Sequence, residues 1–271
     1  MTAPTGVPRP FALTRALLWR LLHEGRRHLL APVLPFVAVL ALMLFTSLRG
    51  SGAVNGAGSF LDVAARYTSG GHALTVGILL TLGPALAALF NSVSVTRAVQ
   101  GLVGAEVTRG GLEELLASPY TPRRISTAVL GYMAAAATGF WAAYMAILVA
   151  AISLVVGTTS AHLRLDTAYT VLSLVFPLLI ALTSGSLALL VSLLFPRLTQ
   201  VGGAAGLSGG NLGNLVSMVP AVGSLFVLTY GLPRLGAGRL LLAAGGGTLL
   251  IAVVSVTLVA ARFSPENVLD S

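Results

Sequence analysis

Long apolar stretches alternate with short polar segments along the whole chain. Six of the stretches are nearly free of charge and match the ~20 residues that a helix needs to cross about 30 Å of hydrocarbon. They are residues 29–48, 73–95, 125–156, 168–195, 201–230 and 240–261. Because hydrocarbon offers no water to backbone N–H and C=O groups, each crossing must be helical. The pattern predicts an all-α integral membrane protein with six transmembrane helices in a single domain, residues 1–271.

The segment that precedes the first span, residues 11–28, mixes arginine with apolar residues. On a helical wheel Phe11, Leu18, Leu21 and Leu22 share one face, and the arginines fall largely elsewhere. One interpretation is an amphipathic helix that lies in the cytoplasmic headgroup layer, with its tryptophan at the interface. The other is a simple basic anchor for the first span, and the two are compatible.

The placement of arginine predicts the orientation of the chain. If the amino terminus is cytoplasmic, eleven of the sixteen arginines fall in the inner segments. Cytoplasmic segments of membrane proteins carry such an excess of basic residues. Both termini and the segment 97–124 are therefore expected in the cytoplasm. The same bias accounts for the formal charge of +8, so nucleic acid is not expected as a partner.

The composition narrows the class of protein further. Hydrophobic residues make up 56% of the chain and charged residues 9%, with a mean hydropathy of +0.92, whereas a soluble domain has about 25% charged residues. All basic side chains are arginine or histidine, so the chain lacks the lysine of a P-loop and has no nucleotide-binding domain of that kind. Without cysteine, and without histidines at metal-ligand spacing, the chain is expected to hold no metal or cofactor and to catalyse no reaction itself.

One short charged segment interrupts the apolar middle of the chain. Residues 106–125 hold three of the eight acidic residues and three of the sixteen arginines. Within them Leu112, Leu115 and Leu116 recur at helical spacing and form one apolar stripe. Either this short helix is a solvated part of the cytoplasmic loop 97–124 whose leucines touch the headgroups, or it is a knob that docks into another protein.

The stretch AEVTRGGLEELLASPYTPRRI, followed by a long apolar span, resembles the signature of ABC-2 type transporter permeases. That family shows an acidic residue, a glycine and an LE-LL-(S/T)P run before its third span. The matching positions are Glu106, Gly111, Leu112, Glu113, Leu115, Leu116, Ser118 and Pro119. The six-span layout, the cytoplasmic termini and the basic amphipathic start also fit. The membrane subunits of heme exporters have a similar loop.

The resemblance implies a membrane subunit of an ABC exporter in the plasma membrane of a bacterium, the inner membrane. A separate P-loop ATPase subunit would bind ATP and Mg. Two copies of the permease, a homodimer rather than a heterodimer, would form the path for an amphipathic or hydrophobic drug, antibiotic, natural product, peptide or lipid. A heme-exporter subunit and a non-transporting membrane scaffold or assembly factor are the alternatives.

The short helix would then be the coupling helix that seats in a groove of the ATPase. Its stripe of leucines would supply apolar contact, and the acidic residues would supply charged contacts at the rim. The residues expected to couple are Glu106, Gly111, Leu112, Glu113, Glu114, Leu115, Leu116, Ser118 and Pro119.

Polar residues inside the predicted spans are the candidates for a cargo path. They are Asn91, Thr183, Ser184, Asn211 and Asn214. Uncompensated amides and hydroxyls are costly in hydrocarbon, so each either makes an interhelical hydrogen bond or lines a polar path. No acid or arginine lies deep in a predicted span, which disfavours proton-driven or ion-driven transport.

Five glycines in the fifth span recur at short spacings. They are Gly202, Gly206, Gly209, Gly210 and Gly213. Small residues at such spacings let membrane helices approach closely. The pattern indicates tight packing within one subunit or, alternatively, a dimer seam beside the cargo path.

Overall fold

The computed structural model describes residues 12–24, 31–49, 57–69, 72–108, 121–159, 161–194 and 212–262. Nearly all of these residues are helical, so the all-α class is confirmed for this part of the chain. The helices are α1 (Ala12–Glu24), α3 (Val33–Arg49), α4 (Ala57–Tyr67), α5 (Ala73–Thr108), α7 (Pro122–Thr159), α8 (Thr167–Leu194), α10 (Leu212–Phe226), α11 (Leu232–Leu240) and α12 (Gly246–Arg262). Single π-helical turns, η1 (Val227–Gly231) and η2 (Leu241–Gly245), flank α11.

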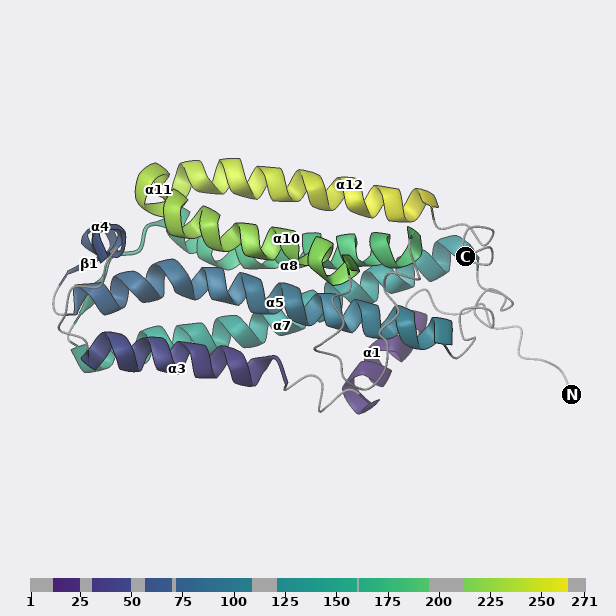
Figure 1. Ribbon diagram of the computed structural model, residues 1–271, viewed down its shortest axis with the longest axis horizontal. Helices are drawn as coiled ribbons and strands as arrows, with labels where there is room; N and C mark the ends of the chain where they lie inside the picture. Colours follow the sequence, from purple (N-terminus) through teal and green to yellow (C-terminus); the bar gives the residue numbers. More distant parts are fainter. Residues whose placement is uncertain are drawn as a thin grey trace, which may run out of the picture.

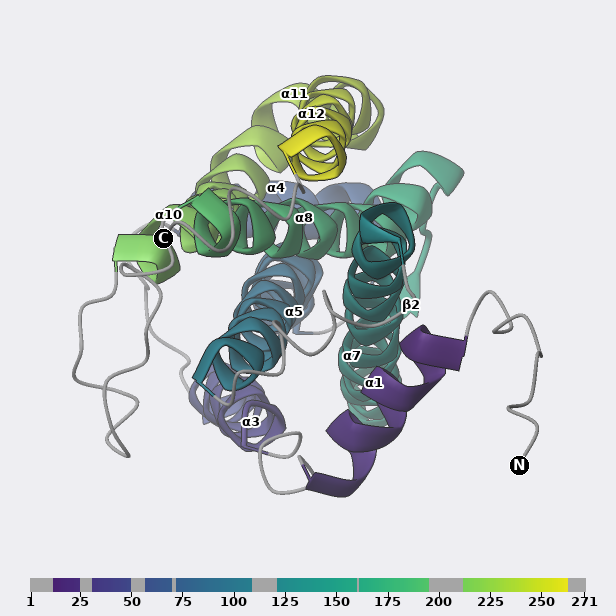
Figure 2. The ribbon, with the colours of Figure 1, turned by 90° about the vertical axis from the view of Figure 1, so that its right-hand side faces the viewer.

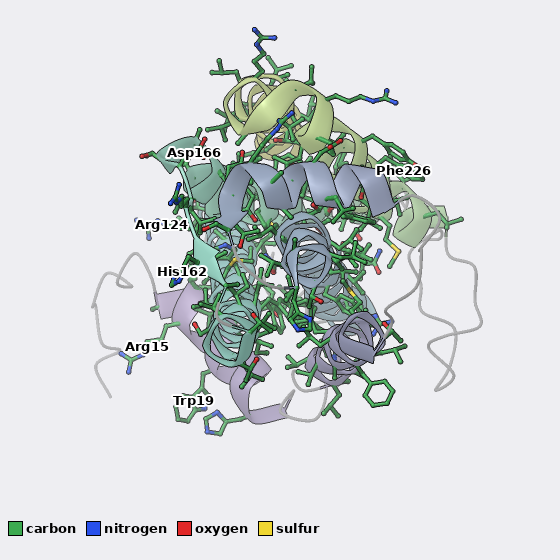
Figure 3. The ribbon with its side chains drawn as sticks, turned by 90° about the vertical axis from the view of Figure 1, so that its left-hand side faces the viewer. Arg15, Trp19, Arg124, His162, Asp166 and Phe226 are labelled. Atoms are coloured by element: carbon green, nitrogen blue, oxygen red, sulfur yellow. The ribbon has the colours of Figure 1, made fainter. Side chains whose placement is uncertain are left out.

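Four helical stretches are long and apolar enough to cross a membrane. They are Ala73–Leu102, Arg124–Thr159, Thr167–Ser192 and Met218–Leu258, and a shorter apolar helix covers Val33–Thr46. Large apolar side chains lie exposed on the outer helices, as Phe226 shows by pointing away from the bundle (Figure 3). A water-soluble monomer rarely exposes so much apolar surface, so the chain is a multi-pass membrane protein.

The predicted cytoplasmic loop 97–124 is partly wrong, because α5 does not end with the apolar stretch. It continues as a helix to Thr108, and α7 already begins at Pro122. A helix satisfies its own backbone hydrogen bonds, so it can run on past the hydrocarbon when its side chains become polar. With 36 residues, α5 is about 54 Å long, well beyond the roughly 30 Å of a bilayer core.

Helices α5, α7 and α8 form the centre of the bundle. The interface between α5 and α8 is the most extensive, followed by that between α5 and α7. Viewed along the bundle, α10 and α12 flank α8, α3 packs on α5 and α7, and α1 crosses the base of α7 (Figure 2). The Phe36 ring of α3 meets the Phe90 ring of α5 at 5.5 Å and the Tyr144 ring of α7 at 4.9 Å.

The bundle has two distinct ends (Figure 1). Helix α1, the end of α5, the start of α7 and the end of α12 gather at one end, which we call the α1 end. Helix α4, the strand β1 (Thr68–Ser69) and α11 gather at the other, which we call the α4 end. There β1 pairs antiparallel with β2 (His162–Leu163), which joins the connection before α5 to the connection before α8.

A glycine, which has no side chain, allows the closest approach among the central helices. A Cβ at Gly185 of α8 would lie 2.7 Å from a methyl of Val95 and 3.0 Å from the Met133 sulfur. The glycine therefore lets α8 contact α5 and α7 at one level. In the same way Gly83 of α5 makes room for Leu148 of α7, whose nearest methyl would lie 2.5 Å from an added Cβ.

The stretch Met218–Leu258 is a helical hairpin and not one rod. Gly236 has φ 73° and ψ 165°, which is not a helical conformation. The chain reverses there, so that α10 and α12 run in opposite directions along the bundle and both pack on α8 (Figures 1 and 2).

Helix α4, which the sequence analysis did not predict, fixes this reversal. Its Val63, Ala64 and Tyr67 are buried, and Arg66 Nη2 donates a hydrogen bond of 2.8 Å to the carbonyl of Pro233 at the start of α11. The rings of Tyr67 and Tyr169 are 4.7 Å apart. Burial raises the pKa of Tyr67 above its ordinary value, so the phenol is neutral at physiological pH.

We expect Gly236→Ala to destabilise the hairpin, because a side chain at this φ and ψ is strained by about 1–3 kcal/mol. The thermal unfolding midpoint of the detergent-purified protein should fall. The control is Gly238→Ala, where an added Cβ meets only the Ala168 Cβ, at 3.9 Å, and where the midpoint should not fall. Equal effects of the two substitutions would contradict the assignment of the reversal to Gly236.

Candidate functional site

Most of the residues expected to couple lie outside the described part of the chain. Only Glu106 lies within it, in the last turn of α5. The coupling residues outside the described part are Gly111, Leu112, Glu113, Glu114, Leu115, Leu116, Ser118 and Pro119. Of the glycines and asparagines of the fifth span, Gly213 and Asn214 lie in the first turn of α10. Gly202, Gly206, Gly209, Gly210 and Asn211 lie outside the described residues.

The two helices that flank the charged segment are firmly joined. The hydroxyls of Ser94 on α5 and Tyr144 on α7 are 2.8 Å apart, and the Tyr132 hydroxyl donates to the Ala98 carbonyl at 3.3 Å. By position along the helices, the first contact lies near the middle of α5 and α7, and the second lies nearer the α1 end. These contacts therefore tie together the two helices on either side of residues 109–120.

Helix α1 lies against the base of α7. The Thr14 hydroxyl donates to the Ala128 carbonyl at 3.5 Å, and its methyl would lie 3.3 Å from a Cβ at Gly131. Arg15 and Trp19 point away from the bundle (Figure 3), and the Trp19 ring stacks on His23 at 3.7 Å. The face that α1 turns to the bundle includes Thr14 and Leu18, and Leu18 belongs to the apolar face expected from the sequence.

Three of the expected path residues are buried within the bundle, and they differ in their partners. Thr183 Oγ1 lies 2.8 Å from the Leu179 carbonyl and 3.2 Å from the Thr248 carbonyl of α12, which fits a packing role. Asn91 and Ser184 are also fully buried. Among the residues that the structure describes, neither amide atom of Asn91 has a hydrogen-bond partner, and neither does the Ser184 hydroxyl.

Asn91 directly precedes a polar row on α5 that the sequence analysis missed, and it lies about 100° around the helix from Ser92 and about opposite Gln100. Ser92, Thr96 and Gln100 follow at four-residue spacing on one face of α5, all buried. The hydroxyls of Ser92 and Thr96 and the amide nitrogen of Gln100 also have no partner within the chain. We call these three residues and Asn91 the α5 polar stripe. The period of polar residues in NSVSVTRAVQ, residues 91–100, is the signal that predicts it.

The lack of partners in the α5 polar stripe is unusual within this protein. Hydroxyls in its helices commonly donate to the carbonyl four residues earlier, as Thr81, Ser94 and Thr138 do. On α8, Ser192 shares the exception with Ser184. Polar groups in protein interiors are normally hydrogen-bonded, so this region of the α5 and α8 interface is the candidate site for a bound molecule.

The site carries no charge among the residues that the structure describes. The polar side chains buried there belong to Ser, Thr, Asn and Gln, whereas Arg97 is exposed. The described residues also contain no group of three or more acidic or histidine side chains that could hold a metal ion. The arrangement can therefore donate and accept hydrogen bonds, and it offers neutral partners only.

Comparisons with models of known protein families, with curated proteins and with solved structures find no match to this chain.

We expect the two single substitutions that break the bond between Ser94 and Tyr144 to lower the stability by different amounts. Ser94→Ala leaves the buried Tyr144 hydroxyl without its partner, at a cost of about 1–3 kcal/mol. Tyr144→Phe leaves the Ser94 hydroxyl its bond of 2.7 Å to the Phe90 carbonyl, so it should cost less. In the Tyr144→Phe background, Ser94→Ala should have little further effect on the unfolding midpoint. Additive effects would show that the two hydroxyls do not depend on each other.

Proposed function

We propose that this chain is the membrane-spanning subunit of an ATP-driven exporter of the ABC-2 type. It would move an amphipathic or hydrophobic cargo out of the cell across a bacterial inner membrane. A separate P-loop ATPase would bind ATP and Mg, and a second copy of the chain would complete the path. The observation that carries the proposal is the motif between Glu106 and Pro119, which connects two joined, membrane-length helices.

The proposal includes six crossings with both termini in the cytoplasm. The crossings would be α3, α5, α7, α8, α10 with η1, and η2 with α12. The last two helical stretches are each about 30 Å long by their residue count, enough for one crossing apiece. In this arrangement the α1 end faces the cytoplasm and α1 lies at the inner headgroups.

The distribution of arginine supports this orientation. The five arginines expected outside, which include Arg66, Arg164 and Arg239, belong to elements or connections at the α4 end. These elements lie on one side of the bundle, although the arginines come from three different connections. The positive-inside bias requires that all the outer connections lie on the same side of the membrane.

Single cysteines can test this topology, because the natural chain has none. A membrane-impermeant maleimide should label His162→Cys in β2 and Leu235→Cys in α11 on intact cells, since both positions are exposed. Ala16→Cys in α1 should be labelled only after the cells are permeabilised. Labelling of Ala16→Cys on intact cells would reverse the orientation, and an inaccessible Leu235→Cys beside a labelled His162→Cys would rule out the fifth and sixth crossings.

The mechanism follows from differential binding at the charged segment. ATP drives the two ATPase subunits together, and the coupling helix moves with the groove that holds it. A ligand shifts a conformational equilibrium only as far as it binds the two states differently. Because Ser94 and Tyr144 join α5 to α7, the movement would tilt both helices against α8.

The partner ATPase provides the direct test. The affinity-tagged chain, extracted from its native cells in mild detergent, should bring a P-loop ATPase with it in stoichiometric amount. Leu115→Asp should remove that subunit and the transport-linked ATP hydrolysis, because it places a charge on the apolar stripe. Ala117→Asp adds the same charge off the stripe and should leave both intact.

Each alternative to this function has its own signature in the same preparation. A natural chain that comes down without any ATPase would favour the membrane scaffold. Bound heme, visible by absorption spectroscopy, would favour the heme exporter. Loss of the ATPase from both aspartate variants would show that the stripe of leucines is not the contact.

A further inference from the structure

The α5 polar stripe holds more unpaired hydrogen-bonding groups than packing alone explains. A buried donor or acceptor without a partner costs about 1–3 kcal/mol. Asn91, Ser92, Thr96 and Gln100 contribute five such atoms on one helix. Thr81 and Ser94 on the same helix form bonds to their own backbone, so the helix itself does not prevent pairing.

A second row of unpaired hydroxyls lies on the neighbouring helix. Ser184 and Ser192 are eight residues apart on α8, about 12 Å along its axis, and neither hydroxyl has a partner within the chain. Ser184 adjoins Gly185, which packs directly against Val95. Helices α5 and α8 share the most extensive interface of the bundle, so the two rows belong to the pair of helices in closest contact.

Both rows lead from the middle of the bundle toward the α1 end. Asn91 lies halfway along α5, and Gln100 lies about 14 Å further on. On α8, Ser184 is also near the middle, and Ser192 is two residues from the end at Leu194. The rows therefore cover one half of the membrane depth, the half on the side of α1 (Figure 1).

We infer that the α5 polar stripe, with Ser184 and Ser192, is a water-accessible binding row for the uncharged hydroxyl or amide groups of a cargo molecule that enters from the α1 end. This inference rests on the proposed function, and it names the class of cargo: an amphiphile with a neutral hydrogen-bonding head.

The chemistry of the row sets this class. Its amides and hydroxyls can both donate and accept, which suits a hydroxyl or an amide on the partner. A carboxylate, phosphate or ammonium group would need a charged partner to offset its loss of water. The described side chains of the row include none.

Thiol labelling tests the row directly, in inside-out membrane vesicles that contain the full chain. The variants are Ser92→Cys, Thr96→Cys and Gln100→Cys, with Val95→Cys and Val99→Cys as controls on the same helix, both fully buried. The probe is 2-hydroxyethyl methanethiosulfonate, which is neutral and carries a hydroxyl. Rates are divided by the rate of the same reagent with a small thiol in solution.

The three stripe positions should react at least about tenfold faster than the controls. The reagent reacts with the thiolate, and a dry apolar site raises the pKa of a thiol, so that each pKa unit lowers the thiolate fraction about tenfold. Equal rates at all five positions, or no reaction at any, would overturn the inference in favour of dry helix packing. Ser92→Cys and Thr96→Cys are near-isosteric changes, so they preserve the test if Gln100→Cys fails to fold.

Charge selectivity tests the class of cargo. Cationic and anionic methanethiosulfonates, normalised in the same way, should react at the stripe about tenfold more slowly than the neutral reagent, the change expected for one unfavourable interaction of about 1.4 kcal/mol. A charged reagent that matches the neutral one would overturn the assignment to neutral groups. Labelling needs no ATPase, so the two proposals can fail separately. A reactive stripe in a chain that has no ATPase partner would refute the exporter function and leave the binding row intact. An unreactive stripe in a chain that does bind an ATPase would refute the binding row alone.

Discussion

The contact of Gly185 with Val95 and Met133 determines how this bundle is built. In a membrane, lipid tails are as apolar as leucine, so helices associate through close fit and not through the removal of water. The absent side chain at Gly185 brings α5, α7 and α8 to one junction. The remaining helices attach to this trio: α3 through the Phe36 ring, and α10 and α12 through α8.

The trio is tied differently at its two ends, and this difference bears on the proposed mechanism. Toward the α4 end, Arg66 holds α11 and the Tyr169 hydroxyl donates to the Leu80 carbonyl at 2.7 Å, so α4, α5, α8 and the hairpin are bound together. Near the middle of the bundle, Ser94 and Tyr144 join α5 to α7, and Trp141 Nε1 of α7 donates to the Leu174 carbonyl of α8 at 2.8 Å. Toward the α1 end, α5 and α8 carry the unpaired polar side chains. Under the proposed function, the pair α5 and α7 would tilt against α8 with the α4 end as the fixed point.

The sequence predicted the elements whose cause is local and missed those whose cause is tertiary. Apolar length alone located α7 and α8 to within a few residues. It stopped the second span at residue 95, because Thr96, Arg97 and Gln100 are polar, although the backbone of α5 stays helical to Thr108. The same choice hid half of the α5 polar stripe, since Thr96 and Gln100 lie beyond the predicted end of that span. Helix α4 escaped because its eleven residues are too few for a span, and their burial against α5 does not show in composition.

The α5 polar stripe is neutral and the segment 106–125 is charged, and both features bear on how transport would be powered. Coupling to a proton or sodium gradient places ionisable groups at membrane depth, whereas the buried polar side chains in the described part of the spans are Ser, Thr, Asn and Gln. Under the proposed function the work must then enter from outside the bilayer. Glu106 lies in the last turn of α5, at the α1 end, and the same helix carries the stripe, so under the proposed function a partner bound there would act on α5. A tilt of α5 that opens its contact with α8 would admit a neutral head group, and release would restore the close fit at Gly185.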